Sequence, residues 1–183
     1  MALTVYTKAE LPQDWAMTQN NMGIVLSEQG MRTGGEAGTR LLAEAVTAYR
    51  AALTVRTKEQ LPQDWAMTQN NLGVTLRKQG TRTGGEAGMR LLTESVTAYR
   101  AALTVHTKEQ LPQLWAGTQT NLGNVLGEQG IYTGGEAGKE LIRQAITAYG
   151  LALQIRTRDA LPVQWEETMR NLEIAKKALE EMK

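Results

Sequence analysis

The sequence predicts an all-α solenoid of three helical hairpins followed by a C-terminal capping helix. Residues 2–51, 52–101 and 102–151 align without a gap at a period of fifty, and residues 152–183 begin a fourth copy that stops early. Within each copy, apolar residues recur at helical spacing. A unit of this size buries its apolar face only against its neighbours, so repetition at a fixed period is typical of a solenoid. We therefore expect residues 1–183 to form a single repeat domain.

The first half of each copy predicts one helix. Pro12 suits the first helical position because its missing N–H would be unpaired there, and Asp14 lies at the positive end of the helix dipole. Gly30 is expected to end this helix in a left-handed cap. The inward stripe is predicted to contain Trp15, Gln19, Met22, Gly23 and Leu26.

The second half of each copy predicts a second helix. Thr33-Gly34-Gly35-Glu36 resembles a capping box, and the helix is expected to start between Gly34 and Gly38. Its apolar stripe has a period near 3.6 residues and consists of Leu41, Leu42, Ala45, Val46, Tyr49, Ala52 and Leu53. The same pattern predicts helices over 62–80, 84–107, 112–130 and 134–157. The charged residues 173–183 predict a solvated capping helix.

The amino-acid composition limits the classes of function that this chain can have. Twenty basic and nineteen acidic residues give a net charge of +1, so neither nucleic acid nor an anionic membrane is expected as the partner. The absence of cysteine excludes disulfides and thiolate chemistry. No segment has the apolar length of a signal peptide or a membrane helix. We expect a soluble, cytoplasmic protein.

The units resemble tetratricopeptide repeats. The family's first-helix signature is matched at Leu72, Gly73 and Leu76, and its second-helix signature is matched at Ser95, Tyr99, Ala102 and Leu103. The equivalent residues of the other two copies are Met22, Gly23, Leu26, Ala45, Tyr49, Ala52, Leu53, Leu122, Gly123, Leu126, Ala145, Tyr149, Ala152 and Leu153. The period of fifty exceeds the family's usual thirty-four. The units are therefore extended, and are most similar to the kinesin light chain type. The resemblance implies a right-handed superhelix.

Nothing in the sequence predicts catalysis. The only histidine, His106, shares a column with Tyr6, Arg56 and Arg156, and we interpret that column as a tolerant surface position. The TGGEAG segments lack the spacing of a phosphate-binding loop and are better explained as a turn that starts a helix. One tryptophan per copy indicates packing between hairpins rather than ligand stacking. We expect no enzyme activity, no cofactor and no metal.

An asparagine column is the strongest functional signal. Asn21, Asn71, Asn121 and Asn171 occupy the same place in the four first helices. The resemblance implies that first helices line a concave groove and that asparagine at this place bonds the backbone of an extended peptide. Asparagine offers both a donor and an acceptor, which suits a main-chain amide. Copying by recent duplication and a structural hydrogen bond between helices remain open as alternatives.

Residues beside this column are expected to share its exposed face and to set specificity. They are Met17, Met67, Asn20, Asn70, Ile24, Val74 and Asn124.

Three hypotheses for the function follow. The first is a scaffold that binds a peptide or a segment of a partner protein in the groove. The second is self-assembly, in which the open N-terminal face of Trp15 and Met22 docks on another chain to form a homo-oligomer. The chain could equally be a fragment of a larger signalling protein. The third places binding on the TGGEAG loops, which fall along one side of a solenoid.

Overall fold

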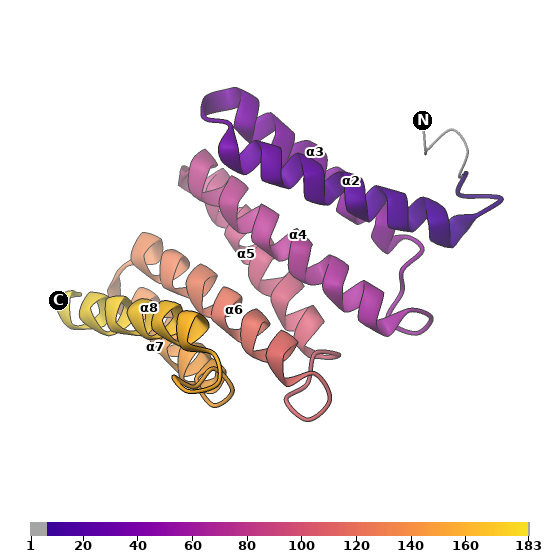
Figure 1. The fold of residues 1–183 in the computed structure, drawn as a ribbon. Helices are drawn as coiled ribbons and strands as arrows, with labels where there is room; N and C mark the ends of the chain where they lie inside the picture. The colour runs from indigo at the N-terminus through magenta and orange to yellow at the C-terminus, as the bar shows by residue number, and fades with distance from the viewer. Residues whose placement is uncertain (1–6, 183) are drawn as a thin grey trace. The chain divides into compact units, whose positions relative to one another are not determined.

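The computed structural model describes residues 7–182, which form helices joined by short loops, with no strand among them (Figure 1). The all-α class is therefore confirmed. The predicted start of the first copy, residues 2–6, lies outside the described residues. None of the helices has both the length and the apolar character needed to cross a lipid bilayer. The helices are α2 (Pro12–Arg32), α3 (Gly35–Leu53), α4 (Pro62–Thr83), α5 (Gly85–Leu103), α6 (Pro112–Thr133), α7 (Gly135–Ala152) and α8 (Pro162–Glu181).

The chain divides into two compact units, Met1–Val105 (unit 1) and His106–Lys183 (unit 2). In unit 1, α2 packs on α3, α3 on α4 and α4 on α5, with a smaller contact between α2 and α4. In unit 2, α6 packs on α7 and α7 on α8, with a smaller contact between α6 and α8. These are the contacts of helical hairpins stacked in sequence order, as a helical repeat requires.

The first helix of each copy begins at its proline, as predicted. The Leu-Pro step places a leucine at the N-cap, and no side chain caps the helix there. The backbone N–H of Trp15 donates to the carbonyl of Leu11 at 2.9 Å, which closes the first turn. Asp14 and Asp64 lie in the first turns of α2 and α4, where the helix dipole favours a negative charge.

The predicted helix end at Gly30 is wrong, because α2 continues to Arg32, and α4 and α6 likewise continue past Gly80 and Gly130. These glycines allow the two helices of a hairpin to approach closely. A Cβ atom at Gly30 would stand 2.9 Å from Cγ of Leu42, and one at Gly80 would stand 2.9 Å from the carbonyl oxygen of Gly88. A residue with a side chain would push the helices apart.

The predicted capping box is also wrong. The N-cap of α3 is Gly34 and not Thr33, and no side chain bonds to the first turn. The start of the second helices is confirmed at Gly35, Gly85 and Gly135, whose φ angles are 60°, 55° and 56°. A positive φ strains a residue that has a side chain. Glycine is therefore favoured at these positions because it adopts the backbone conformation of the turn without strain. The second helices end at Leu53, Leu103 and Ala152, short of the predicted 107 and 157.

Glycine and tyrosine fix the register within each hairpin. A Cβ atom added at Gly23 would stand 2.7 Å from the ring of Tyr49. The same contact recurs between Gly73 and Tyr99 at 2.8 Å, and at 2.6 Å between Gly123 and its partner tyrosine, Tyr149. The Leu-Gly step of each first helix therefore faces the tyrosine of the second helix. The ten extra residues at TGGEAG do not disturb this pairing.

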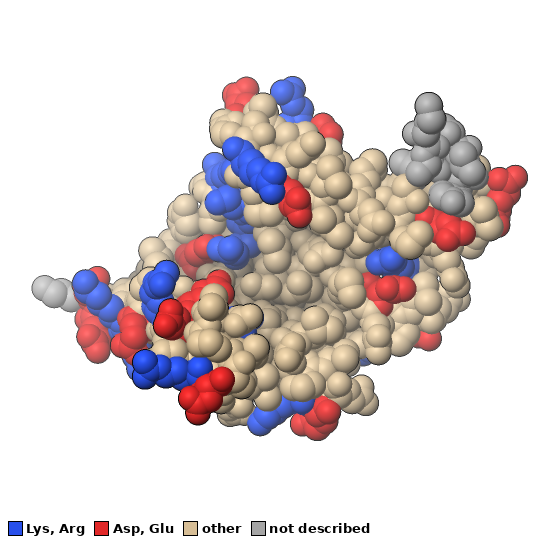
Figure 2. All heavy atoms as spheres, viewed as in Figure 1, with Lys and Arg blue, Asp and Glu red and all other residues tan. Residues whose placement is uncertain are grey.

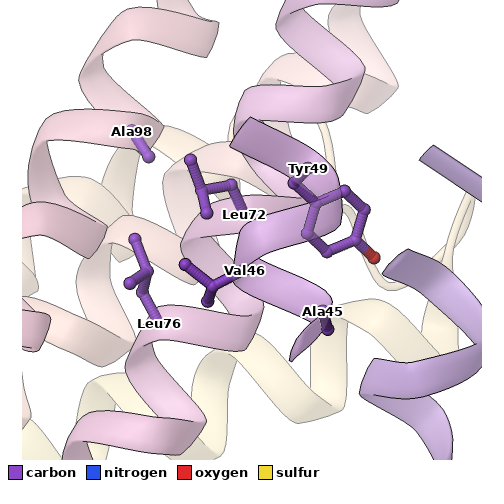
Figure 3. Close-up of a cluster of buried hydrophobic side chains, with 6 residues drawn as sticks. All are labelled: Ala45, Val46, Tyr49, Leu72, Leu76 and Ala98. Atoms are coloured by element: carbon purple, nitrogen blue, oxygen red, sulfur yellow. The ribbon is translucent and has the colours of Figure 1, made fainter. Parts of the chain in front are cut away.

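The core of unit 1 joins its two hairpins. Leu72 and Leu76 of α4 lie against the buried face of α3 (Figure 3). The complete cluster consists of Ala45, Val46, Tyr49, Leu72, Leu76 and Ala98. The aromatic ring and the two leucines are the largest side chains of this cluster, and their burial removes apolar surface from water.

The helix α8 buries one face and exposes the other. Leu172 and Ala175 are buried, whereas Glu173, Lys176 and Lys177 are exposed. Ile174 is also exposed, so the outer face of α8 is charged but not entirely polar.

Candidate functional site

The asparagine column of unit 1 lies on the first helices of its two hairpins, α2 and α4. Asn71 is half-buried, and its carboxamide has no hydrogen-bond partner within residues 7–182. Asn21 is exposed, and its Oδ1 atom receives only a long contact of 3.5 Å from Nδ2 of Asn20. Both side chains therefore retain donors and acceptors for a ligand.

A small cavity of about 140 Å³ opens beside Asn71. Two of the predicted flanking residues, Ile24 and Val74, lie on its wall together with Asn71. The hydroxyl groups of Ser27 and Thr75 bond each other at 2.8 Å and thereby tie α2 to α4. The remaining lining residues are Glu28, Met31 and Tyr49.

Two further predicted residues, Met17 and Met67, are exposed on α2 and α4. Methionine side chains adapt to different surfaces because they are unbranched and polarizable. The middle of α2 and α4 is mostly free of charged residues on the face that Figure 2 shows, and the charged side chains gather near the helix ends. Apart from the carboxylate of Glu28 on the cavity wall, the surface around the cavity is therefore suited to uncharged contacts.

Asn20 does not share the exposed face, and this expectation is wrong. Its side chain is 4% exposed, and its Oδ1 atom accepts a hydrogen bond of 3.2 Å from the hydroxyl of Thr68. It belongs to the contact between α2 and α4. Asn70, the equivalent residue of α4, is half-buried and makes interactions of its own.

In unit 2 the asparagines bond one another. Oδ1 of Asn124 accepts a hydrogen bond of 2.8 Å from the hydroxyl of Tyr149 and one of 3.0 Å from Nδ2 of Asn171. Asn121 is half-buried and also has an interaction within the chain. The structural alternative, a hydrogen bond between neighbouring first helices, thus holds for Asn171.

A larger open cavity of about 720 Å³ lies between the start of α3 and the end of α4, against the first TGGEAG segment. Three of its polar side chains are bonded within unit 1. The guanidinium of Arg82 donates to the carbonyls of Gly30, Met31 and Thr33 and so caps the C-terminal end of α2. Thr39 and Thr83 donate to carbonyls of their own helices. The other polar side chains on its wall are those of Glu36, Arg40 and Gln79, and Oε1 of Gln79 is buried with no hydrogen-bond partner among residues 7–182. The larger cavity therefore also offers polar groups to a ligand, but no asparagine of the column lies on its wall.

The tryptophan side chains of all four copies are half-buried and not fully buried in the core. A basic group lies over the ring in three of the four copies. Nζ of Lys8 is 5.5 Å from the ring centre of Trp15, and Nζ of Lys108 is 5.9 Å from that of Trp115. Cζ of Arg158 lies 5.7 Å from the ring of Trp165. These cation–π contacts cover ring faces that a ligand would otherwise stack on.

The interpretation of His106 as a surface residue is wrong. Its side chain is 2% exposed, and Nδ1 lies 3.1 Å from the hydroxyl of Thr118. In the second and fourth copies an arginine from this column donates to the equivalent threonine at 3.0 Å. The signal that sequence analysis missed is this pairing of a nitrogen donor with a threonine twelve residues later.

The neighbour of this column differs among copies. Arg56 has the carboxylate of Asp64 4.0 Å away, whereas Leu114 and Gln164 stand at the equivalent positions of the third and fourth copies. His106 therefore contacts Thr118 without a carboxylate at that position.

Burial lowers the pKa of His106 below its ordinary value of 6.5. The unfolded chain therefore takes up the proton at a higher pH than the folded chain does, and stability falls as the pH drops below about 6.5. We expect the loss of stability between pH 7.5 and pH 5.5 to be smaller in the variant His106→Gln, which cannot titrate but can bond Thr118. Urea denaturation of both proteins at the two pH values measures this. Equal losses in the two proteins would show that His106 contributes nothing to the pH dependence.

No group of three or more His, Asp or Glu side chains is placed to hold a metal ion within residues 7–182. Comparison of the chain with models of known protein families and with curated proteins finds no match. The sequential packing of hairpins is consistent with a helical repeat.

Proposed function

We propose that the chain is a non-catalytic interaction module, a tetratricopeptide-like right-handed superhelix that binds an extended peptide or a segment of a partner protein along its first helices. The observation that carries the proposal is the cavity in unit 1 where Ile24, Asn71 and Val74 meet. An apolar wall beside an unused carboxamide is the chemistry of a peptide subsite, in which the amide holds the main chain and the wall holds one side chain.

The size of the cavity supports a single side chain as its occupant. A water molecule fills about 30 Å³ of liquid, so about 140 Å³ accommodates about four or five heavy atoms. This is the size of a leucine or methionine side chain. Ile24, Val74 and Met31 would surround it with apolar surface, while Asn71 remains beside the peptide backbone.

The affinity of a bound peptide tests this proposal. We expect a peptide selected from a random phage-displayed library on the intact chain to bind the double variant Asn21→Ala, Asn71→Ala about thirtyfold more weakly. Each lost hydrogen bond contributes about 1 kcal/mol, and two together give this factor. Isothermal titration calorimetry measures the two dissociation constants.

A matched control removes two hydroxyls from the second helices instead. Thr47 and Thr97 are exposed on α3 and α5, and their hydroxyls bond only carbonyls of their own helices. The variant Thr47→Ala, Thr97→Ala should bind the selected peptide as the parent does. An unchanged affinity in the asparagine variant would exclude the groove as the site.

A further inference from the structure

An apolar stripe runs along one face of α2 in unit 1. Its members are three or four residues apart, so they share one side of the helix. We call this surface the α2 stripe; it consists of Leu11, Trp15, Thr18, Met22, Val25 and Gln29. Met22 is 36% exposed and Val25 is 54% exposed. Figure 1 shows α2 at the edge of unit 1, and its neighbours among the described helices of that unit are α3 and α4.

The same face one copy later is buried inside unit 1. Leu72, which is equivalent to Met22, is 7% exposed and packs in the core cluster against Val46. Thr75, which is equivalent to Val25, is 0% exposed. The α2 stripe is therefore the surface that this repeat uses to pack on another helix, and no helix within residues 7–105 covers it.

Two side chains of opposite charge lie at the two ends of the α2 stripe. Asp14 lies in the first turn of α2 and Arg32 in its last turn. Neither side chain forms an ion pair or a side-chain hydrogen bond within residues 7–182. Their equivalents in α4 are both engaged, because Asp64 faces Arg56 and the guanidinium of Arg82 caps α2.

The positions of these charges are self-complementary. Eighteen residues separate Asp14 from Arg32, which is five turns at 3.6 residues per turn, so both lie on the same side of α2. Their midpoint is Gly23, next to Met22. A twofold axis that lies between two α2 helices at this height, perpendicular to both, would bring Asp14 of one copy opposite Arg32 of the other, twice.

We propose that a second copy of this chain docks on the α2 stripe, with the two α2 helices antiparallel about a twofold axis near Met22. The apolar residues would pack across the axis, and two Asp14–Arg32 ion pairs would flank them. An isologous contact of this kind closes on itself and gives a dimer rather than a filament. If the stripe packed on α8 of another copy, it would meet Glu173 and Lys176 as well as Ile174, which are all exposed on that helix.

Charge reversal tests both the contact and its direction. We expect the parent chain to show a mass in analytical ultracentrifugation that rises from monomer to dimer with concentration. Asp14→Lys and Arg32→Glu should each raise the dissociation constant of the dimer about tenfold or more, because each places like charges together twice. Mixing the two variants should restore dimers, since the mixed pair again places opposite charges together at both ends.

Gln13→Lys is the matched control, because Gln13 is exposed beside Asp14 but points about 100° away from it around the helix. It should dimerise as the parent does, and circular dichroism should show the same helix content in every variant. A parent chain that stays monomeric at all concentrations would overturn the proposal. So would reversed-charge variants that dimerise like the parent, or that fail to recover on mixing.

Discussion

The variant Tyr49→Ala is expected to lower the free energy of unfolding of unit 1 by about 3–5 kcal/mol. Tyr49 is 2% exposed and joins three elements, because its ring faces Gly23 of α2 and lies in the cluster with Leu72 of α4. Removing the ring leaves a cavity that the glycine opposite cannot fill. Urea denaturation followed by circular dichroism measures the change.

Tyr49→Phe separates the ring from its hydroxyl. The hydroxyl bonds Thr75, whose own hydroxyl also contacts Ser27. Keeping the ring and losing this one bond should cost about 1 kcal/mol. If Tyr49→Ala cost no more than Tyr49→Phe, the ring would not be the element that holds the two hairpins together.

Gly88→Ala has the second largest expected effect, a loss of about 2–3 kcal/mol. A Cβ atom at Gly88 would stand 2.5 Å from the carbonyl oxygen of Gly80, which is a contact with backbone rather than with a flexible side chain. The start of α5 and the end of α4 would therefore have to separate. Alanine is otherwise the better helix former, so destabilisation here runs against intrinsic propensity.

The control is Gly150→Ala, in the last turn of α7. No atom lies within 4 Å of a Cβ atom built at Gly150. The substitution should therefore raise stability by about 0.5–1 kcal/mol. Opposite signs in the two glycine variants are expected in thermal or urea denaturation. Stabilisation in both would mean that α4 and α5 are not held as closely as the geometry requires.

The sequence was sufficient to predict the helices and their order. Leu-Pro steps start the first helices, and the 3.6-residue stripes of the second helices supply the core residues Tyr49 and Leu42. These signals are local, and the repetition of each signal in every copy makes them easy to recognise. The hairpin register also follows from the Leu-Gly step and the tyrosine, although the length of the turn obscured it.

The errors concern what a residue meets across the fold. A glycine at position 30 is typical of a helix end, but here it allows a close contact with Leu42 of the second helix. This contact cannot be inferred from the first helix alone. The column of His106 varies among copies although the place is not exposed, because His106 is buried and contacts Thr118. Asn20 was taken as a groove residue because it precedes Asn21, yet helical geometry turns it by about 100° toward Thr68.

The asparagine column also shows that identical residues of a repeat can have different surroundings in the fold. Its four members are identical in sequence, but Asn71 has an unused carboxamide beside a cavity while Asn171 bonds Asn124. The difference lies in the neighbouring first helix, where Ile24 stands beside Asn71 and Asn124 bonds Asn171.

The most direct test of the groove is amide chemical-shift mapping by NMR, with an isotope-labelled chain and the library-selected peptide. We expect the largest shifts at Ile24, Asn71 and Val74, the residues that share the small cavity. Shifts confined to Gly34, Gly35 and Thr39 would instead place the peptide on the larger cavity beside the TGGEAG segment and would contradict the account.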